Sequence, residues 1–380
     1  MAEIEIGLGK SGRRGYSLAE VSIVPSRRTR DADEIDVAWQ LDAYQFEIPV
    51  IAAALDGVTS PSTAIEMSRL GGAGALHLDG LWCRYEDPTS LLEELATSGS
   101  DTSTERLQAI YAKPVDPELI KVRVGEIHDV GGTAVVAVTP QTTEDLLPHI
   151  IAAEPDLLVI QATVTSAEHV SAGAHQPLDL KHLVRRLEVP VLVGGCTSYQ
   201  AALHLMRTGA AGVIVGMGPR TGSTSRRVLG IGNPLATAIA DARAARMRHL
   251  DETGVYVHVI AEGGIHTGGD IAKAVVCGAD GVILSSPLAR AETAPAGGAF
   301  WPMSASHRSL PRGRVRKVDP VGSLEAILNG PSHRSDGRTN LIGGLRKSMA
   351  VAGYGTLKEL QKADLMVTAP PSVVPGQQWA

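Results

Sequence analysis

The sequence predicts an α/β protein built as a (β/α)8 (TIM) barrel, and three observations support this fold class. Short apolar runs of strand length recur along the 380-residue chain and alternate with amphipathic segments of helical period. The runs are continuously apolar, which is typical of parallel strands that are buried on both faces. A barrel of this kind usually needs about 250 residues and can exceed about 400 with insertions, so the length fits one barrel with additions.

The apolar runs define the expected barrel elements in order. The expected strands are 48–55, 74–78, 133–138, 156–162, 190–195, 212–217, 257–263 and 281–286. The amphipathic helices expected between them are 61–70, 143–153, 178–187, 198–208, 234–250 and 268–277. An open doubly wound sheet is the alternative, but no GxGxxG follows the first strand, which disfavours a Rossmann domain.

A repeated turn supports the barrel. The segments RLGGAGALHL, RTGAAGVIVG and VCGADGVILS each end a helix at a glycine and then enter a strand. Glycine at such a position supplies the left-handed cap that turns the chain back into the sheet. The three copies indicate one structural unit used repeatedly.

Three segments interrupt the alternation within what we expect to be a single domain, residues 1–380. Residues 1–47 form an N-terminal extension. Residues 84–131 form a long, charged insert with a helix expected at 116–129. Residues 291–340, rich in Gly, Pro, Ser and Arg, are expected to form an active-site loop or flap after the last strand, because long loops in compact domains are usually functional.

Composition excludes several classes of function. The net charge of −6 and the aromatic content of 3% disfavour binding to nucleic acid. Cys83, Cys196 and Cys277 have neither metal-ligand spacing nor the pattern of a disulfide framework. No apolar run approaches the about 20 residues of a membrane helix, so we expect a soluble, cytoplasmic protein.

Glycine- and hydroxyl-rich loops follow the last three expected strands. They are GMGPRTGSTSR, AEGGIHTGGD and SSPLAR. One such turn is ordinary in any barrel. Three on neighbouring strands, with helix N-termini behind them, predict a phosphorylated ligand at the carboxyl ends of the strands.

These loops also carry a resemblance to a known family. VGMGPRTGSTSRRVLGIGNPLATA resembles, without a gap, the catalytic loop of the IMP dehydrogenase/GMP reductase family. IAEGGIHTGGDIAKAVVCGADGVILSSPLARAETAP, YSLAEVSIVPSRR with IPVIAAALDGVTS, and NLIGGLRKSMAVAGYGTLKEL are similar to further family motifs. The resemblance spans nearly the whole chain. Residues 84–131 are too few for the tandem cystathionine-β-synthase-type regulatory domains of many members, so the chain resembles a short branch without them.

The resemblance implies a role for each matching residue. The catalytic cysteine falls on Ser223, and the active-site threonine two positions later falls on Ser225. The aspartate that binds the ribose hydroxyls falls on Glu262. The implied substrate contacts are Thr221, Gly222, Glu262, Gly263, Gly264, Ser285, Ser286, Gly322 and Leu55. The implied contacts to NAD are Gln161, Ala162, Thr163, Gly216 and Gly218, with Gln161 in place of an aspartate.

Other departures bear on the mechanism. The potassium-binding carbonyls of the family map to Gly218, Arg220 and Ser223, and an arginine in place of a loop glycine disfavours that site. Val318 replaces a tyrosine that contacts the phosphate. The flap lacks the tyrosine of the family's Arg-Tyr pair, and Arg334 is a candidate for its arginine.

A serine needs a general base, and the loop around Ser223 contains none. Candidates by position are His266, His307, His333 and Asp336, although each is more simply a loop or surface residue. Cys196 follows a strand that ends near the site, but a small buried thiol is its simpler interpretation.

Three functions remain open at this point. The first is a purine-nucleotide oxidoreductase, converting IMP to XMP with NAD in guanine nucleotide metabolism. The second is a catalytically silent nucleotide-binding relative that regulates or co-assembles with an active dehydrogenase, since Ser223 replaces the cysteine. The third is another phosphate-binding barrel enzyme, such as a flavin-dependent one, which the gapless match disfavours. The family also implies a homotetramer.

Overall fold

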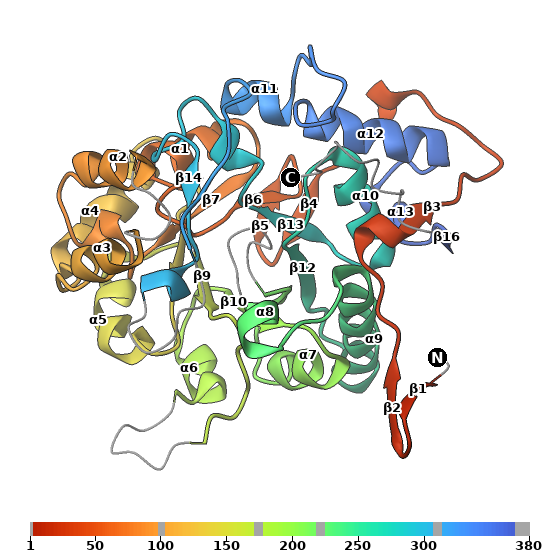
Figure 1. The fold of residues 1–380 in the computed structure, drawn as a ribbon, viewed down its shortest axis with the longest axis horizontal. Coiled ribbons are helices and arrows are strands. Elements are labelled where there is room, and N and C mark those ends of the chain that lie inside the picture. Colours follow the sequence, from red (N-terminus) through yellow and green to blue (C-terminus); the bar gives the residue numbers. More distant parts are fainter. Residues whose placement is uncertain (1–2, 98–102, 171–177, 218–224, 307–313, 369–380) are drawn as a thin grey trace.

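The computed structural model describes residues 3–97, 103–170, 178–217, 225–306 and 314–368. Among these residues, eight parallel strands close into a barrel in the order β10-β11-β12-β13-β6-β7-β8-β9 (Figure 1). The predicted fold class is confirmed, and each expected strand is present. The barrel strands are β6 Val50–Ala52, β7 Ala73–His77, β8 Val135–Val138, β9 Leu157–Gln161, β10 Val191–Cys196, β11 Gly212–Val215, β12 His258–Glu262 and β13 Gly281–Leu284.

Apolar strand residues fill the centre of the molecule. Val213 of β11 pairs with Val193 of β10 on one side and with Val259 of β12 on the other, and all three are fully buried. β-Branched side chains suit a strand that packs on both faces, because their restricted rotamers cost little entropy there. The continuous apolar runs in the sequence therefore reflect burial on two sides.

The repeated glycine turn is present at all three predicted places. Gly71, Gly209 and Gly278 have φ angles of 84°, 99° and 124°. At Gly278 a Cβ atom would lie 2.4 Å from the Cδ atom of Arg243, so space as well as conformation requires glycine.

The six expected barrel helices are also present. Local sequence explains their starts: Ser60 accepts a hydrogen bond from the Thr63 amide at 3.0 Å, and Thr267 and Asp270 form a capping box. The expected helix at 116–129 is α4. These helices are α1 Pro61–Arg69, α4 Pro117–His128, α5 Thr143–Ala153, α6 Leu180–Arg186, α7 Tyr199–Met206, α9 Leu235–Thr253 and α10 Gly268–Cys277.

Further elements decorate the barrel. The additional helices are α2 Thr89–Thr97, α3 Ser103–Ile110, α8 Ser225–Leu229, α11 Leu324–Leu328, α12 Leu341–Ala352 and α13 Leu357–Leu360. The 3-10 helices are η1 Leu18–Glu20, η2 Ala32–Glu34, η3 Leu81–Cys83, η4 Leu288–Arg290 and η5 Met303–Ser306. The strands outside the barrel are β1 Glu3–Gly7, β2 Lys10–Arg13, β3 Val21–Ile23, β4 Trp39–Leu41, β5 Tyr44–Phe46, β14 Ala299–Phe300, β15 Arg316–Lys317 and β16 Leu365–Val367.

The two inserts pack against each other and form a second hydrophobic core. Figure 1 shows α2, α3 and α4 grouped at one side of the barrel, near β14. The sequence indicated only α4 in this region. The residues of the second core are Leu81, Leu92, Leu95, Leu107 and Ile110 from the first insert and its approach, and Ala296, Ala299, Trp301 and Ala305 from the second.

Buried polar contacts join the second core to the barrel. The Tyr111 hydroxyl donates to Oδ2 of Asp56, in the loop after β6, and accepts from Nε1 of Trp301 at 2.9 Å. A Cβ atom on Gly57 would lie 2.2 Å from the carbonyl oxygen of Ala299, so β14 lies directly on that loop. The inserts are therefore anchored at the carboxyl end of the first barrel strand.

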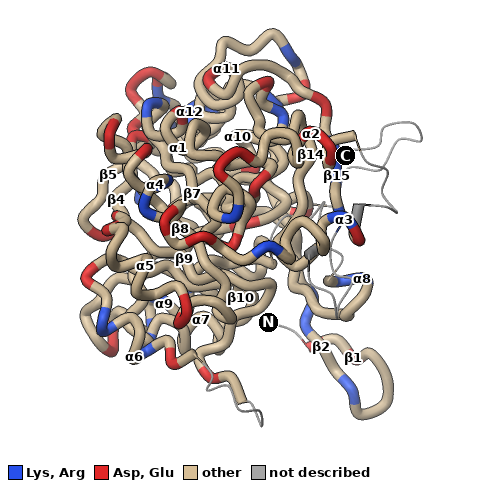
Figure 2. The backbone as a smooth tube through the Cα atoms, turned by 90° about the vertical axis from the view of Figure 1, so that its left-hand side faces the viewer, with Lys and Arg blue, Asp and Glu red and all other residues tan. Residues whose placement is uncertain are grey.

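The N-terminal extension begins with a β-hairpin of β1 and β2 that projects from the body (Figures 1 and 2). Arg13 at its base forms an ion pair with Asp241 of α9 at 2.8 Å. Figure 2 shows acidic and basic residues interspersed along the described chain. No helix in the described ranges is both long and apolar enough to cross a membrane. The single domain over 1–380 and the cytoplasmic location stay predictions.

Candidate functional site

The predicted ligand-binding residues that the structure describes gather at one end of the barrel. Because all barrel strands are parallel, their carboxyl ends share one face, which we call the barrel mouth. The residues at or just beyond these strand ends are Leu55 after β6, Gln161, Ala162 and Thr163 at β9, Gly216 after β11, Glu262, Gly263 and Gly264 at β12, and Ser285 and Ser286 after β13.

Two of these residues touch across the mouth. Nε2 of Gln161 donates a hydrogen bond to Oε2 of Glu262 at 2.5 Å. β9 and β12 are not neighbours, since β10 and β11 separate them in the barrel. Burial raises the pKa of the Glu262 carboxyl to about 7, and the Gln161 hydrogen bond opposes that rise. Glu262 is therefore a buried acid that titrates near neutral pH.

The backbone beside Glu262 leaves no room for a side chain. Gly216 has a φ of 133°, and a Cβ atom there would lie 1.9 Å from the carbonyl oxygen of Glu262. Such an overlap excludes every residue except glycine. The close approach of the two segments places the end of β11 against the end of β12.

Hydrogen bonds also fix the end of β9. The Ala162 amide donates to the Gly194 carbonyl, and the Gly195 amide donates to the Ala162 carbonyl, both at 2.9 Å. The buried Thr165 hydroxyl donates to the Gly194 carbonyl at 2.5 Å, and its amide donates to Gly195. These contacts hold Gln161, the last residue of β9, at a defined place beside β10.

The loops after β12 and β13 contain the residues that the sequence predicts as a phosphate cradle. Gly263 and Gly264 have φ angles of 101° and 70°, which turn the chain sharply out of β12. The Ser286 hydroxyl lies 3.4 Å from Nδ1 of His266. Ser285 and Ser286 are buried, and the amino end of α10 follows the loop after β12. Two hydroxyls and a histidine beside the start of a helix suit a phosphate.

Two further predicted substrate contacts, Leu55 and Gly322, come from the loop after β6 and from the second insert. Leu55 is buried in a turn after β6 in which its carbonyl accepts from the Val58 and Thr59 amides. Gly322, with a φ of 153°, accepts a hydrogen bond from the Glu292 amide at 2.9 Å. Leu55 follows the barrel strand next to β13, whereas Gly322 belongs to the second insert.

The catalytic loop is mostly outside the described residues. Thr221, Gly222 and Ser223 lie there, as do Gly218 and Arg220 of the potassium prediction. Ser225 is described: it begins α8 and is 2% exposed. Among the described residues, no group of three His, Cys, Asp or Glu side chains could hold a metal ion.

The candidate bases differ in their surroundings. Asp336 forms ion pairs with Arg334 at 2.7 Å and with Arg338 at 3.8 Å, and these contacts lower its pKa, so it is a poor base. His333 is exposed, and His307 lies outside the described residues. His266 alone of the four candidates is seen to face a predicted ligand-binding side chain, Ser286. Arg334, the candidate flap arginine, is held by Asp336.

The cysteines do not form a disulfide. Cys83, Cys196 and Cys277 are all free and buried. Burial raises the pKa of the Cys196 thiol to about 12, although the residue ends β10 at the mouth. A thiol that stays protonated at neutral pH is a weak nucleophile, which agrees with the interpretation of Cys196 as a small core residue.

Comparison with known proteins settles the relationship. The family model described as "IMP dehydrogenase / GMP reductase domain" matches residues 15–314. The chain belongs to the IMP dehydrogenase/GMP reductase family. It is thus, by family, an oxidoreductase of the IMP dehydrogenase/GMP reductase type. The family that the sequence motifs predicted is thereby confirmed.

Individual relatives of this IMP dehydrogenase/GMP reductase chain fall in two groups. An uncharacterized oxidoreductase of Mycolicibacterium smegmatis is 52% identical over 96% of this chain and 99% of its own. The inosine-5′-monophosphate dehydrogenase of Cryptosporidium parvum is 25% identical over 92% and 90%. The crystal structure of an IMP dehydrogenase/GMP reductase-like protein from Corynebacterium glutamicum superposes with a TM-score of 0.90, at 44% identity over 96% and 98%.

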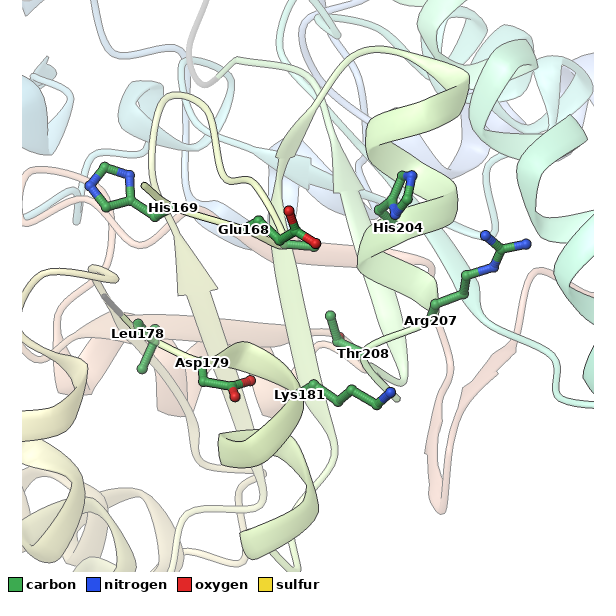
Figure 3. A pocket seen from close by; sticks show the side chains of 9 residues that line it. Glu168, His169, Leu178, Asp179, Lys181, His204, Arg207 and Thr208 are labelled. Atoms are coloured by element: carbon green, nitrogen blue, oxygen red, sulfur yellow. The ribbon is translucent and has the colours of Figure 1, made fainter. Parts of the chain in front are cut away.

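A cavity lies away from the mouth of this family member, on the outside of the barrel. It has a volume of about 460 Å³ and lies between α6 and the C-terminal end of α7 (Figure 3). Lys181, His204 and Arg207 are among the residues that line it, and Arg207 is paired with Glu252 at 2.7 Å. None of the residues predicted from the family motifs lines it.

Sequence reasoning missed the contact between Gln161 and Glu262. Both residues were recognised separately as departures from the family pattern. One signal was available in the sequence. Relative to the family pattern, the acid at position 262 is longer by one methylene and residue 161 has lost its charge, and both residues end strands at the same mouth. The Asp56–Tyr111–Trp301 contacts left no such signal, because their members lie in three unrelated segments.

Proposed function

We propose that the chain is a purine-nucleotide oxidoreductase that converts IMP to XMP with NAD, in guanine nucleotide metabolism. The observation that carries the proposal is the conjunction, at one barrel mouth, of a buried acid for a ribose diol, Glu262, with the cradle of Gly263, Gly264 and Ser286. Membership of the family supports the purine base. Ser223 stands at the position of the family nucleophile, and Ser225 beside it is buried at the start of α8.

The residues at the end of β9 fit the dinucleotide. Gln161 is half-buried at the mouth, and among the described residues nothing donates to its amide oxygen. That oxygen can accept a hydrogen bond from a ribose hydroxyl, with Ala162 and Thr163 beside it. NAD, which the family generally uses, would accept the hydride from the purine.

The alternative is a catalytically silent nucleotide-binding relative. Ser223 in place of cysteine favours it, because a serine hydroxyl needs a base, and His266 is the only candidate among those considered that faces the cradle. This holds for those of the four candidate bases that the structure describes. Such a protein would keep the phosphate and ribose contacts and regulate or co-assemble with an active dehydrogenase.

One experiment separates the two. Purified protein is mixed with IMP and NAD while NADH absorbance is followed, beside a Ser223→Cys variant. Turnover of the wild type with XMP formed supports the oxidoreductase and excludes the silent relative. Activity in Ser223→Cys alone supports an intact site without its nucleophile. Absence of any thermal shift with IMP, XMP or GMP would remove the purine proposal altogether.

We also propose a homotetramer, which the family implies. Exposed apolar side chains on the projecting hairpin, Ile4, Ile6 and Leu8, support an assembly that covers them. Light scattering after size-exclusion chromatography measures the mass directly, and a monomeric mass would contradict the proposal.

A further inference from the structure

Gln161 and Glu262 form a contact that neither residue's predicted role requires. Gln161 was assigned to the cofactor and Glu262 to the substrate ribose. In the structure the side-chain amide of Gln161 donates a hydrogen bond to the Glu262 carboxylate at 2.5 Å. The contact crosses the barrel mouth, because β10 and β11 lie between the two strands that carry these residues. The two subsites therefore share one hydrogen bond.

Both ends of this contact are held firmly. Gln161 ends β9, whose following residues are bonded to Gly194 and Gly195 of β10. Glu262 ends β12, where its backbone carbonyl packs against Gly216 so closely that no side chain fits between. Since the backbone is fixed at both residues, the barrel itself holds the two side chains within hydrogen-bonding distance.

Glu262 has few other ways to be stabilised when ionised. The residue is 4% exposed, and burial is the main cause of its raised pKa. Among the described residues, no cation contributes, and the Gln161 amide is the one group that favours the carboxylate. His266, in the loop after β12, is a further titratable group at the mouth, and it faces Ser286.

A carboxylate can accept more hydrogen bonds than Gln161 supplies. Its two oxygens offer about four lone-pair sites, of which the amide uses one. A ribose cis-diol offers two donors. The same carboxylate can thus bind a diol while it keeps its glutamine contact, provided that it carries no proton.

We propose that Gln161 is a positioning residue for substrate recognition, which holds the Glu262 carboxylate over the mouth in the form that accepts hydrogen bonds from the 2′- and 3′-hydroxyls of a ribonucleotide. The inference rests on the proposed purine-nucleotide function. Replacement of the family's acid by glutamine then compensates for a longer acid at position 262.

The test is the pH dependence of binding by isothermal titration calorimetry, with IMP and 2′,3′-dideoxy-IMP as paired probes. The ratio of their two affinities isolates the diol, because the phosphate and the groups around it are common to both probes. For the wild type the ratio should be roughly tenfold to a hundredfold above about pH 7 and should fall toward one below it, as Glu262 takes up a proton.

Variants of Gln161 then test its role. Gln161→Leu removes the donor, so the midpoint of the ratio should move upward in pH while the affinity for 2′,3′-dideoxy-IMP stays unchanged. Gln161→Asn shortens the side chain by one methylene and should move this midpoint in the same direction. Gln361→Leu is the matched control, since Gln361 lies at the opposite end of the barrel beside Asp280 and should leave the profile unchanged.

The outcomes separate this inference from the function on which it rests. If IMP binds but the midpoint in both Gln161 variants equals that of the wild type, the positioning role is overturned and the purine proposal stands. If the ratio is independent of pH in the wild type, the inference is likewise overturned. If neither nucleotide binds at any pH, both proposals fail.

Discussion

Tyr111→Phe is the sharpest test of how the inserts are anchored. The change removes one hydroxyl, which donates to Asp56 and accepts from Nε1 of Trp301 at 2.9 Å. Both partners are 1% exposed, so water does not replace the lost hydroxyl without a rearrangement. The other oxygen of Asp56, Oδ1, has no hydrogen-bond partner among the described residues.

The magnitude follows from the two groups that lose their partner. A buried polar group without a hydrogen bond costs about 1–3 kcal/mol, so Tyr111→Phe should lower the free energy of unfolding by about 2–6 kcal/mol. For a chain of 380 residues the entropy of unfolding is about 0.8 kcal/mol per degree. The melting temperature should therefore fall by about 3–8 °C.

The effect should also depend on pH, with a definite sign. Burial raises the pKa of the Asp56 carboxyl above 3.8, and the Tyr111 hydrogen bond opposes that rise. A carboxyl with a raised pKa in the folded state destabilises the fold once it ionises, so its favourable state lies at low pH. Loss of the tyrosine hydroxyl raises the pKa further. The loss of unfolding free energy in Tyr111→Phe, relative to the wild type, should thus be larger near neutral pH than toward pH 3.8.

Thermal unfolding followed by circular dichroism at about pH 7 and about pH 5 measures both effects. Tyr85→Phe is the matched control, because Tyr85 lies in the same insert and donates one hydrogen bond, at 2.9 Å, to the Ile110 carbonyl. If Tyr111→Phe melts within one degree of Tyr85→Phe at both pH values, the hydroxyl does not anchor the inserts and the reasoning fails.

Three further predictions concern the barrel itself. Gly216→Ala should destabilise the protein by at least about 3 kcal/mol, because its Cβ would lie 1.9 Å from the Glu262 carbonyl; soluble yield and melting temperature measure this. Asp280→Asn should cost about 3–5 kcal/mol, because Arg246, 2% exposed, loses its carboxylate at 2.8 Å. Burial favours the protonated form of Asp280, but the neighbouring cations lower its pKa overall. Its contribution to stability should therefore persist at neutral pH and be lost only in acid, which a series of melting temperatures at different pH values measures. Cys196, with a pKa of about 12, should resist iodoacetamide at neutral pH, as followed by mass spectrometry.

Each of these has its own control. Gly125→Ala, in the middle of α4 with nothing within 4 Å, should stabilise slightly, so equal loss in both glycine variants would contradict the steric argument. Glu252→Gln breaks exposed ion pairs with Arg207 and Arg248 and should change the melting temperature far less than Asp280→Asn. In urea all three cysteines should react, and rapid labelling of native Cys196 would show that it is accessible.

The barrel could be predicted from sequence because its signals are local. A continuous apolar run reports burial on two faces, and Gly71, Gly209 and Gly278 mark turns that only glycine adopts easily. The strand ends, and with them most of the candidate site, followed directly from the strand assignments. Family motifs then gave each residue a role that the fold alone does not.

The inserts and the Gln161–Glu262 contact could not be predicted, because their determinants are far apart in the chain. α2 and α3 are stabilised by Ala299 and Trp301, about two hundred residues later, and a short helix in a charged segment has a weak signal of its own. The contact across the mouth depends on barrel closure, which brings the ends of β9 and β12 within hydrogen-bonding distance.

The second hydrophobic core has a consequence for how such proteins can be recombined. Its two halves, around Leu92 and Leu107 in one insert and Trp301 in the other, bury their apolar surface against each other. A chimaera that exchanged one insert between relatives would expose half of this core to water. The two inserts are therefore a single unit of exchange, so the second insert can be altered by recombination only together with the helices α2 and α3, which precede it by about two hundred residues.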